Sequence, residues 1–400
     1  MGIWKYKKLG DVCKTGAGGT PLKSHKEYYE NGTIPWIRSG EVDNREINDC
    51  EIKITELGLN NSSAKLFPSG TVVLAMYGAT AGEVGILNIE CSTNQAVCGI
   101  YPNPNFIPEF LYYFFLKFKE ELIAQAVGNA QPNISQAKIK NTLIPVISVE
   151  EQQQIVDILD QAFEAIDQAK ANIEKNIENA KELFQSKLNH IFSQKGEGWE
   201  EKTLGQLCIK TKNIKWQDHK NEEYQYVDLS SVSRETLEVT ETAIVNEKNA
   251  PSRAKKIMEK GDVIFATTRP TLKRATIVNE KLHGQICSTG YVVLRPNENI
   301  STDWIFFYLL TSTFMDRMES LQRGASYPAV SDNDVKGSIL SIPTSKNVES
   351  KYVGVMQEIR EGTNELIFQY HEKLNSLEEL KKSILQKAFS GKLTNKIVEV

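Results

Sequence analysis

The sequence predicts an α+β protein in which two globular α+β domains are joined by two long antiparallel coiled-coil helices, with an internal pseudo-two-fold repeat. Two observations predict this class. Sequence motifs recur in the same order at an offset of about 195 residues, which indicates a duplicated architecture. Within each copy, short β-type runs come first and a long stretch of helical apolar periodicity follows. With 40% hydrophobic and 24% charged residues, the 400-residue chain has the composition of a globular protein.

The repeat sets the domain boundaries. Each copy opens on a Trp followed by Leu-Gly, as in Trp4 to Gly10 and Trp199 to Gly205. The matching segments are 4–13 with 199–208, 68–74 with 259–265, 97–103 with 291–297, 109–116 with 303–310 and 182–193 with 379–390. We therefore expect a first globular domain over 1–148, a long helix over 149–195, a second globular domain over 196–345 and a second long helix over 346–400.

Local signals support these elements in order. Runs such as 71–75, 261–266 and 290–295 are rich in β-branched and aromatic residues and are separated by Gly, Pro and Asn, which is typical of short strands. The glycines of segment 16–19 indicate a turn. Segment 148–151 reads Ser-Val-Glu-Glu, a capping box that starts the first long helix, and Gly196 and Gly198 stop it.

Each long helix carries one apolar seam, with apolar residues at every third or fourth position. At about 1.5 Å per residue each helix is about 65 to 70 Å long, and a seam of that length needs a partner helix. The residues expected to pair the helices or to dock a partner are Ile155, Leu159, Ile166, Ile173, Ile359, Leu366 and Leu377. The alternative is that each helix covers its own globular domain. Charged replacements of Ile155 and Leu159 are expected to uncouple the helices or a partner and to leave the globular domains intact.

Catalytic signatures are missing from the sequence. The Gly-Lys pair at 391–392 is followed by Leu393, so there is no P-loop, and Pro21 breaks the dinucleotide-binding fingerprint that starts at Gly16. The five His are scattered, and no Asn/Asp-Pro-Pro-Tyr/Phe run for amino methylation is present. Asp43 with Glu51 and Lys53 matches a nuclease-like pattern too permissive to carry weight. We expect no catalytic residue in this chain.

The sequence also gives no support for a metal site or for a membrane-spanning segment. The six Cys include no Cys-x-x-Cys pair, which predicts no metal site and favours buried thiols in a reducing compartment. The N-terminus has no apolar leader region, and no apolar run approaches the roughly 18 to 20 residues of a membrane span. The expected location is the cytoplasm, with no membrane contact.

Several segments resemble the specificity (S) subunits of type I restriction-modification systems. The resemblance covers essentially the whole chain and rests on the duplicated Trp and Leu-Gly openings, on segments 19–21 (Gly-Thr-Pro), 35–40 (Pro-Trp-Ile-Arg-Ser-Gly) and 128–135, and above all on 144–159. The second copy departs from the pattern at 342–353, where the Glu-Glu-Gln step is absent. This departure leaves open whether the two junctions dock partners in the same way.

The resemblance implies a non-catalytic, DNA-binding role. Each globular domain is then a target recognition domain that reads one half of a bipartite target in double-stranded DNA. The helices space the two readers and dock two methyltransferase (M) subunits, and restriction (R) subunits join for cleavage. S-adenosylmethionine, ATP and Mg²⁺ belong to those partners in DNA methylation and restriction, and this chain needs no cofactor of its own.

Charge narrows the choice of DNA-contacting residues. The net charge is −4 with 47 Lys+Arg against 51 Asp+Glu, so contacts with DNA must come from local clusters and amides. The candidates are Lys23, Arg38, Tyr77, Asn94, Gln95, Asn129, Gln131 and Asn133 in the first domain, and Arg253, Lys255, Lys256, Arg269, Lys273 and Arg274 in the second. Ordinary solvated loop charges and turn-forming amides are the plainer interpretation of the same residues.

Two rival functions remain open at this point. The first is a coiled-coil scaffold whose globular domains bind protein partners and not DNA. The second is an enzyme with a divergent active site, which methyl transfer by the isolated chain would reveal.

Overall fold

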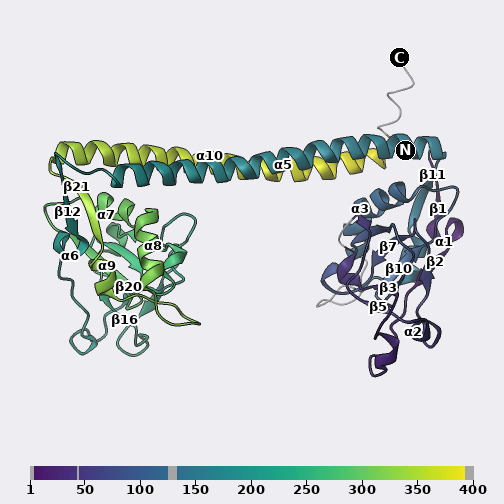
Figure 1. Ribbon diagram of the computed structural model, residues 1–400, viewed down its shortest axis with the longest axis horizontal. Helices are drawn as coiled ribbons and strands as arrows, with labels where there is room; N and C mark the ends of the chain where they lie inside the picture. The colour runs from purple at the N-terminus through teal and green to yellow at the C-terminus, as the bar shows by residue number, and fades with distance from the viewer. Residues whose placement is uncertain (1–3, 43–44, 125–132, 392–400) are drawn as a thin grey trace, which may run out of the picture. The chain divides into compact units, whose positions relative to one another are not determined.

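The computed structural model describes residues 4–42, 45–124 and 133–391. The chain divides into two compact units. Unit 1 comprises Met1–Asn172 with Glu372–Val400, and unit 2 comprises Ile173–His371. Two long helices, α5 (Val149–Phe192) and α10 (Lys346–Ala388), each contribute residues to both units (Figure 1). The mixed α+β architecture, its internal repetition and the two long helices confirm the predicted fold class.

Unit 1 is built from two larger sheets, a two-stranded sheet and several helices. Its strands are β1 (Lys5–Lys8), β2 (Thr15–Ala17), β3 (Ile34–Ile37), β4 (Glu46–Ile47), β5 (Lys53–Ile54), β6 (Leu66–Phe67), β7 (Val72–Ala75), β8 (Val84–Leu87), β9 (Cys91–Thr93), β10 (Val97–Ile100) and β11 (Leu143–Val146). Its helices besides α5 and α10 are α1 (Leu9–Val12), α2 (Glu56–Asn60), α3 (Pro108–Ala124) and α4 (Gln136–Asn141), with 3-10 turns η1 (Lys26–Tyr28), η2 (Ser39–Glu41) and η3 (Gly78–Thr80). The sheet orders are β2-β10-β7-β8-β4 and β5-β3-β9-β6.

Strand β7 shows why unit 1 has layers. Successive side chains of a strand point to opposite faces. Val72 and Leu74 pack into the cluster that contains α3 and α5, whereas Val73 and Ala75 pack into a second cluster with Ile37 and Phe67 of the other sheet. All four residues of β7 are buried, so the continuous apolar run in the sequence reflects burial on both faces.

Unit 2 repeats this plan. Its strands are β12 (Trp199–Thr203), β13 (Cys208–Ile209), β14 (Tyr224–Val227), β15 (Ala243–Val245), β16 (Ala254–Ile257), β17 (Val263–Ala266), β18 (Ala275–Ile277), β19 (Ile286–Ser288), β20 (Tyr291–Pro296) and β21 (Ile339–Pro343). Its helices are α6 (Leu204–Leu207), α7 (Thr302–Tyr308), α8 (Ser312–Leu321) and α9 (Asp332–Lys336), with 3-10 turns η4 (Trp216–Asp218), η5 (Pro270–Leu272) and η6 (Glu280–Leu282). The sheet orders are β13-β20-β17-β18 and β15-β14-β19-β16.

Strand β17 takes the place of β7 in unit 2. Val263 and Phe265 pack into the cluster with α7 and α8, and Ile264 and Ala266 pack into the cluster beneath the second sheet. The antiparallel neighbours of β17 are β18 and β20, as those of β7 are β8 and β10. The sequence repeat is therefore a repeat of topology.

A two-stranded sheet stands at the base of the long helix in each unit. Strand β1 pairs with β11, which leads into α5, and β12 pairs with β21, which leads into α10. In unit 1 the fully buried Gln152 ties α5 to the segment before α3. Its Oε1 accepts from Ile107 N at 3.0 Å, and its Nε2 donates to Asn105 O at 2.8 Å and Ile147 O at 3.1 Å.

Unit 2 makes the same connection with a carboxylate. Glu349 of α10 is 2% exposed, and its Oε1 accepts from Ser301 N at 2.7 Å. Its other oxygen lies 3.2 Å from Lys346 Nζ. The departure of the second junction from the Glu-Glu-Gln step is thus a replacement of a buried amide by a buried, ion-paired carboxylate.

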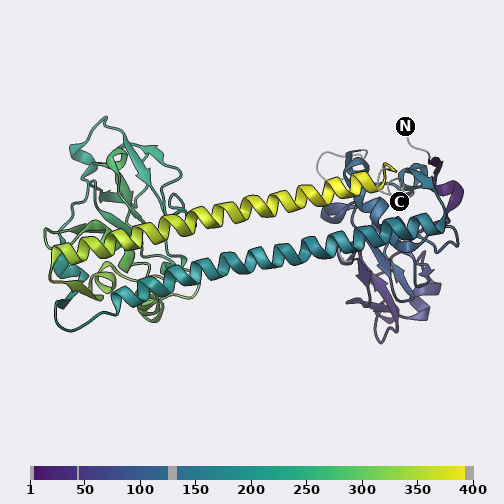
Figure 2. The ribbon, with the colours of Figure 1, turned by 90° about the horizontal axis from the view of Figure 1, so that it is seen from above.

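Within unit 1 the two long helices run antiparallel (Figure 2). Asp167 of α5 lies 3.3 Å from Lys381 of α10, and Lys170, further along α5, forms an ion pair with Glu378, which comes earlier in α10. At the start of α5, Ile155 and Leu159 share one buried cluster with Leu385 and Ala388 near the end of α10. Side-chain contacts between the helices therefore occur in unit 1 at both apolar and charged positions.

Ile155 and Leu159 also belong to the core of the globular part of unit 1. Both are fully buried and share a cluster with Phe110 and Phe114 of α3. The expectation that charged replacements there would leave the globular domain intact is therefore wrong, because the same side chains line its core. The two interpretations of the apolar seam, helix pairing and cover of the globular domain, both apply to this end of α5.

The remaining seam residues differ in burial. In unit 1 Ile166 is 5% exposed and Leu377 is half-buried. In unit 2 Ile173 and Ile359 are half-buried, and Leu366 is 39% exposed. The assignment of these residues to helix pairing or partner docking stays a prediction.

A brace joins a loop of unit 1 to α5. The Arg45 guanidinium donates to both carboxylate oxygens of Asp160, at 2.6 and 3.1 Å, and Tyr113 also donates to Asp160. Burial disfavours ionisation of Asp160, but the hydrogen bonds from Arg45 and Tyr113 and the Arg45 charge outweigh it and lower the pKa of this carboxyl. The chain just before β4 is thereby fixed to the long helix.

Over 4–42, 45–124 and 133–391, no helix is long and apolar enough to cross a membrane, and no group of three or more His, Cys, Asp or Glu is placed to hold a metal ion. The six Cys are unpaired, and burial raises the pKa of the Cys98 and Cys287 thiols to about 12.

Candidate nucleic-acid interface

In unit 1 backbone hydrogen bonds bring four separate segments together at the ends of strands. Asn94 N donates to Ile37 O at the end of β3, at 2.9 Å. Met76 N, just after β7, donates to Ala96 O at 2.7 Å, and Ile134 N donates to Met76 O at 2.8 Å. These hydrogen bonds link the segments in the spatial order 37–38, 94–96, 76–77 and 133–134. Neighbouring segments that are far apart in the sequence therefore carry the candidates Arg38, Tyr77, Asn94, Gln95 and Asn133.

Unit 2 assembles its equivalent segments in the same way. Thr267 N, just after β17, donates to Gly290 O at 2.8 Å, and Val330 N donates to Thr267 O at 2.9 Å. Thr289 N donates to Arg253 O at 2.8 Å, which adds the start of β16. The turn after β17 and the loop before α9 thus correspond to the turn after β7 and the loop before α4.

The candidates of unit 1 differ in how free their polar groups are. Arg38 forms ion pairs with Glu41 and with Glu51, and the hydrogen bond that its guanidinium donates to Glu41 raises the pKa of the Arg38 side chain. Asn94 uses its Oδ1 to accept from Ala96 N at 3.1 Å, as a turn-forming amide does. Tyr77 is 37% exposed and forms an isolated bridge with Asn133.

Of the four remaining candidates of unit 1, two belong to the described residues and two do not. The exposed Gln95 amide accepts from the Thr20 hydroxyl. Lys23 is exposed on the loop that follows. Asn129 and Gln131 lie outside the described residues, as does Asp43 of the nuclease-like pattern.

The glycines of segment 16–19 have a different role from the one predicted. Neither Gly18 nor Gly19 has a positive φ. A Cβ on Gly18 would lie 2.1 Å from Thr93 Oγ1, and one on Gly19 would lie 2.4 Å from Ala64 N. Gly18 allows the backbone to approach the end of β9 closely, and Gly19 allows it to approach segment 63–64, so a turn does not explain them.

In unit 2 the candidates Arg269 and Lys273 flank the turn η5 between β17 and β18. Both have left-handed backbone conformations, with φ of 50° and 53°. Arg269 N donates to Pro328 O at 2.7 Å, and Thr268 bridges to Ala329, so the loop before α9 holds the turn in place. Non-glycine residues in this region are strained and cluster at functional sites.

The remaining basic candidates of unit 2 are partly committed to internal contacts. Lys256 is 13% exposed in its side chain, and its Nζ lies 2.6 Å from both Asp332 Oδ2 and Tyr291 O. Arg274 donates to Leu229 O. Arg253 and Lys255 are exposed.

Sequence reasoning missed Tyr327 and Arg323 on the loop before α9. Tyr327 is 71% exposed, and the Arg269 guanidinium lies over its ring, 4.9 Å from the centroid. Arg323 pairs with Ala329 through two backbone hydrogen bonds of 2.9 Å, and its side chain is 71% exposed. The sequence signal was available, because Gly324 and Pro328 are part of the repeat framework and the Tyr between them departs from it.

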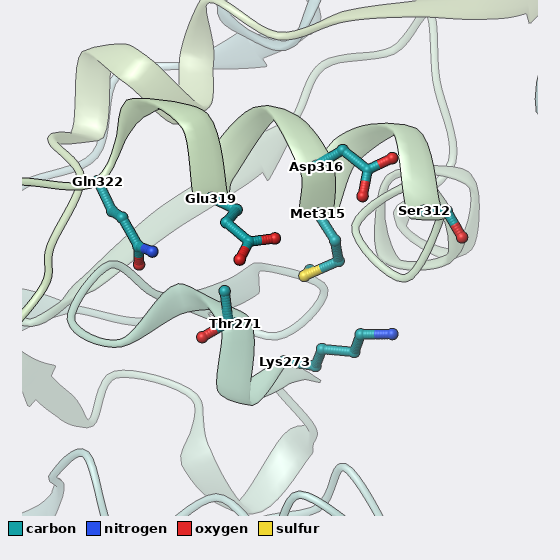
Figure 3. A pocket seen from close by; sticks show the side chains of 7 residues that line it. All are labelled: Thr271, Lys273, Ser312, Met315, Asp316, Glu319 and Gln322. Atoms are coloured by element: carbon teal, nitrogen blue, oxygen red, sulfur yellow. The ribbon is translucent and has the colours of Figure 1, made fainter.

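A shallow depression of about 340 Å³ lies beside the same turn (Figure 3). Thr271 and Lys273 of the turn form one side, and residues of α8 form the other. They are Ser312, Met315, Asp316 and Glu319, with Gln322 just after the helix. The buried Gln322 Oε1 has no hydrogen-bond partner in the part of the chain that the structure describes. The η5 turn is therefore bordered by charges of both signs, from Lys273, Asp316 and Glu319, and by the Gln322 amide.

The family follows from the match of its model to both copies. The model named type I restriction modification DNA specificity domain matches residues 1–179 and again 196–379. The chain belongs to this family. Each match contains one of the two sets of hydrogen-bonded segments at strand ends, together with the start of one long helix.

Known specificity subunits resemble the chain over its full length. The MjaIX specificity subunit of Methanocaldococcus jannaschii is 24% identical over 98% of this chain and 93% of its own. The EcoKI specificity subunit of Escherichia coli K12 is 22% identical over 98% of this chain and 89% of its own.

Solved structures show the same fold. The HsdS subunit from Thermoanaerobacter tengcongensis aligns with a TM-score of 0.61 and 20% identity, over 98% of this chain and 97% of that one. A chain from a study of complex assembly and conformational transition in the type I R-M system aligns with a TM-score of 0.78 and 21% identity, over 98% of both chains.

Proposed function

We propose that this specificity-family chain reads a bipartite sequence in double-stranded DNA, with one half-site bound by each unit. The observation that carries the proposal is that both units bring the same set of segments together at the ends of their strands. In both units a turn after the central strand, a loop before a short helix and the end of a neighbouring strand meet through backbone hydrogen bonds. Rigid elements of this kind position side chains against base edges, while cationic groups contact phosphates.

The two sets of segments carry different side chains, so the two half-sites differ. Unit 1 offers mainly a tyrosine and amides, among them Tyr77 and Gln95. Unit 2 offers Arg269, Lys273 and Tyr327 at the corresponding places. Amides suit adenine and guanidinium groups suit guanine in the major groove.

The long helices space the two readers and dock methyltransferase subunits. α5 has 44 residues and is therefore about 66 Å long. Its apolar residue Leu183 is 58% exposed, and on α10 Phe368 and Leu380 are 62% and 46% exposed. We assign these exposed apolar side chains to contact with the partner subunits.

Catalysis belongs to the partners in this proposal. Two M subunits methylate an adenine in each half-site with S-adenosylmethionine, and R subunits cleave with ATP and Mg²⁺. This chain is not an enzyme and works in the cytoplasm, where the DNA and the partner subunits are found.

Footprinting tests the proposal directly. The full chain is combined with its M subunits on DNA fragments of the host genome, and protection is mapped at nucleotide resolution. We expect two protected half-sites separated by an unprotected spacer of fixed length. Assembly with M subunits but no sequence-specific protection would instead support the rival scaffold whose globular units bind proteins.

A further inference from the structure

We propose that Arg269 reads a guanine in the half-site bound by unit 2, and that Tyr327 holds its guanidinium in position for this. The inference rests on the proposed function and deepens it by naming a residue that determines specificity and the base it selects. It is carried by the contacts of the arginines in unit 2 and by the geometry of the turn.

Most arginines of unit 2 are already committed. Arg295 and Arg323 have carboxylate partners within 4 Å, as does Arg234. Arg274 and Arg360 donate to main-chain carbonyl groups, and Arg317 donates through Nε to the Ser338 hydroxyl at 3.2 Å. In the described part of unit 2, Arg253 and Arg269 are the two arginines that have neither a carboxylate within 4 Å nor a side-chain hydrogen bond of 3.3 Å or less, because the bond from Arg269 Nη2 to Ser326 O measures 3.4 Å.

Arg269 differs from Arg253 because its guanidinium is pre-positioned. One face lies against the Tyr327 ring, 4.9 Å from the centroid. The backbone is fixed in the left-handed region with φ of 50° and by the bond from Arg269 N to Pro328 O. A guanidinium that contacts a ring with its face can still donate from its edge, and a side chain held in this way has little freedom left to lose on binding.

The chemistry of these donors selects the base. An exposed planar fork of N–H groups matches the two acceptors O6 and N7 of guanine, and a bidentate pair discriminates against the wrong base by roughly 5- to 150-fold. Tyr327 presents no competing carboxylate. A phosphate contact would need charge alone, and Lys273 at the other end of the same turn already supplies an exposed charge.

The test is selection from a pool of random duplexes. The full chain with its M subunits is incubated with the pool, bound duplexes are sequenced, and Arg269→Ala, Arg269→Lys and Tyr327→Ala are compared with the parent chain. Arg234→Ala is the matched control, because Arg234 is also an exposed arginine of unit 2. Thermal unfolding of each variant is measured in parallel.

We expect the parent chain and Arg234→Ala to enrich the same bipartite motif. Tyr327→Ala should weaken the preference at the guanine that Arg269 reads, and an unchanged motif in this variant overturns the positioning role of Tyr327. Arg269→Ala and Arg269→Lys should each lose preference at one guanine of one half-site, with the other half-site and the unfolding temperature unchanged. An unchanged motif in both Arg269 variants overturns the inference. Equal weakening at every position also overturns it, because this result indicates a phosphate contact. If the parent chain itself enriches no motif, the proposed function fails, and this outcome is distinct from a failure of the Arg269 variants alone.

Discussion

Replacing Gln152 by Ala should destabilise unit 1 strongly, because this one side chain ties α5 to the globular part. Gln152 is fully buried and makes three hydrogen bonds, from Ile107 N and to Asn105 O and Ile147 O. Alanine removes all three and leaves an amide and two carbonyl groups without partners in a site closed to water.

The expected loss of unfolding free energy follows from these three hydrogen bonds. A typical buried hydrogen bond contributes about 0.5 to 1.5 kcal/mol net, so the loss should be about 3 kcal/mol. Unit 1 contains about 200 residues, for which 1 kcal/mol corresponds to about 2 to 4 °C. The unfolding midpoint of unit 1 should fall by about 6 to 12 °C.

Scanning calorimetry of the full chain measures this change. Gln153→Ala is the matched control, because Gln153 is the next residue, is exposed and bonds only to Asp157 at 2.8 Å. The control should stay within about 0.5 kcal/mol of the parent. Equal effects of the two substitutions would refute the role assigned to the buried amide.

Three further outcomes are expected. Inserting four helical residues near Ala171 in α5 should lengthen the helix by about 6 Å and change the DNA spacer by about one to two base pairs, with both half-sites unchanged. Selection from random duplexes measures this change. An altered half-site would contradict the role of the helix as a spacer. The pKa of Asp160 is lowered in the folded chain, so its stabilising contribution is present above its ordinary pKa of 3.8 and is lost as the pH falls through the folded value. Asp160→Asn should therefore unfold at a lower temperature than the parent at pH 7, with a gap that closes below about pH 4; a gap independent of pH would count against the ion pair. With pKa values raised to about 12, Cys98 and Cys287 should resist alkylation at pH 8 in the native chain and react in denaturant, and rapid native labelling detected by mass spectrometry would contradict their burial.

Much of the fold was predictable because the repeat and the periodicity are properties of the residues themselves. The runs around Val72 and Val263 predicted strands, and the structure places these residues in corresponding central strands. The start of α5 was also predictable, since Ser148 Oγ accepts from Glu151 N at 3.2 Å as the capping pattern implied. Such signals act over a few residues and need no knowledge of tertiary contacts.

The candidate site was less predictable, because its organisation depends on contacts between distant segments. Lys256 looks in the sequence like any other basic residue of its cluster, yet in the fold it is paired with Asp332, 76 positions away. Tyr327 gains its interest only from the Arg269 guanidinium placed over it. Burial and pairing of this kind arise from topology, and local sequence patterns do not encode them.

Methylome sequencing of the host, with and without this chain, is the most direct test of bipartite DNA recognition by the two units. We expect one asymmetric bipartite motif that is adenine-methylated in both halves when the chain is present and unmethylated when its gene is deleted. Restoring the gene should restore methylation at the same motif. Identical methylomes in an expressing host and its deletion strain would contradict the claim that the two units read the two halves of a DNA target.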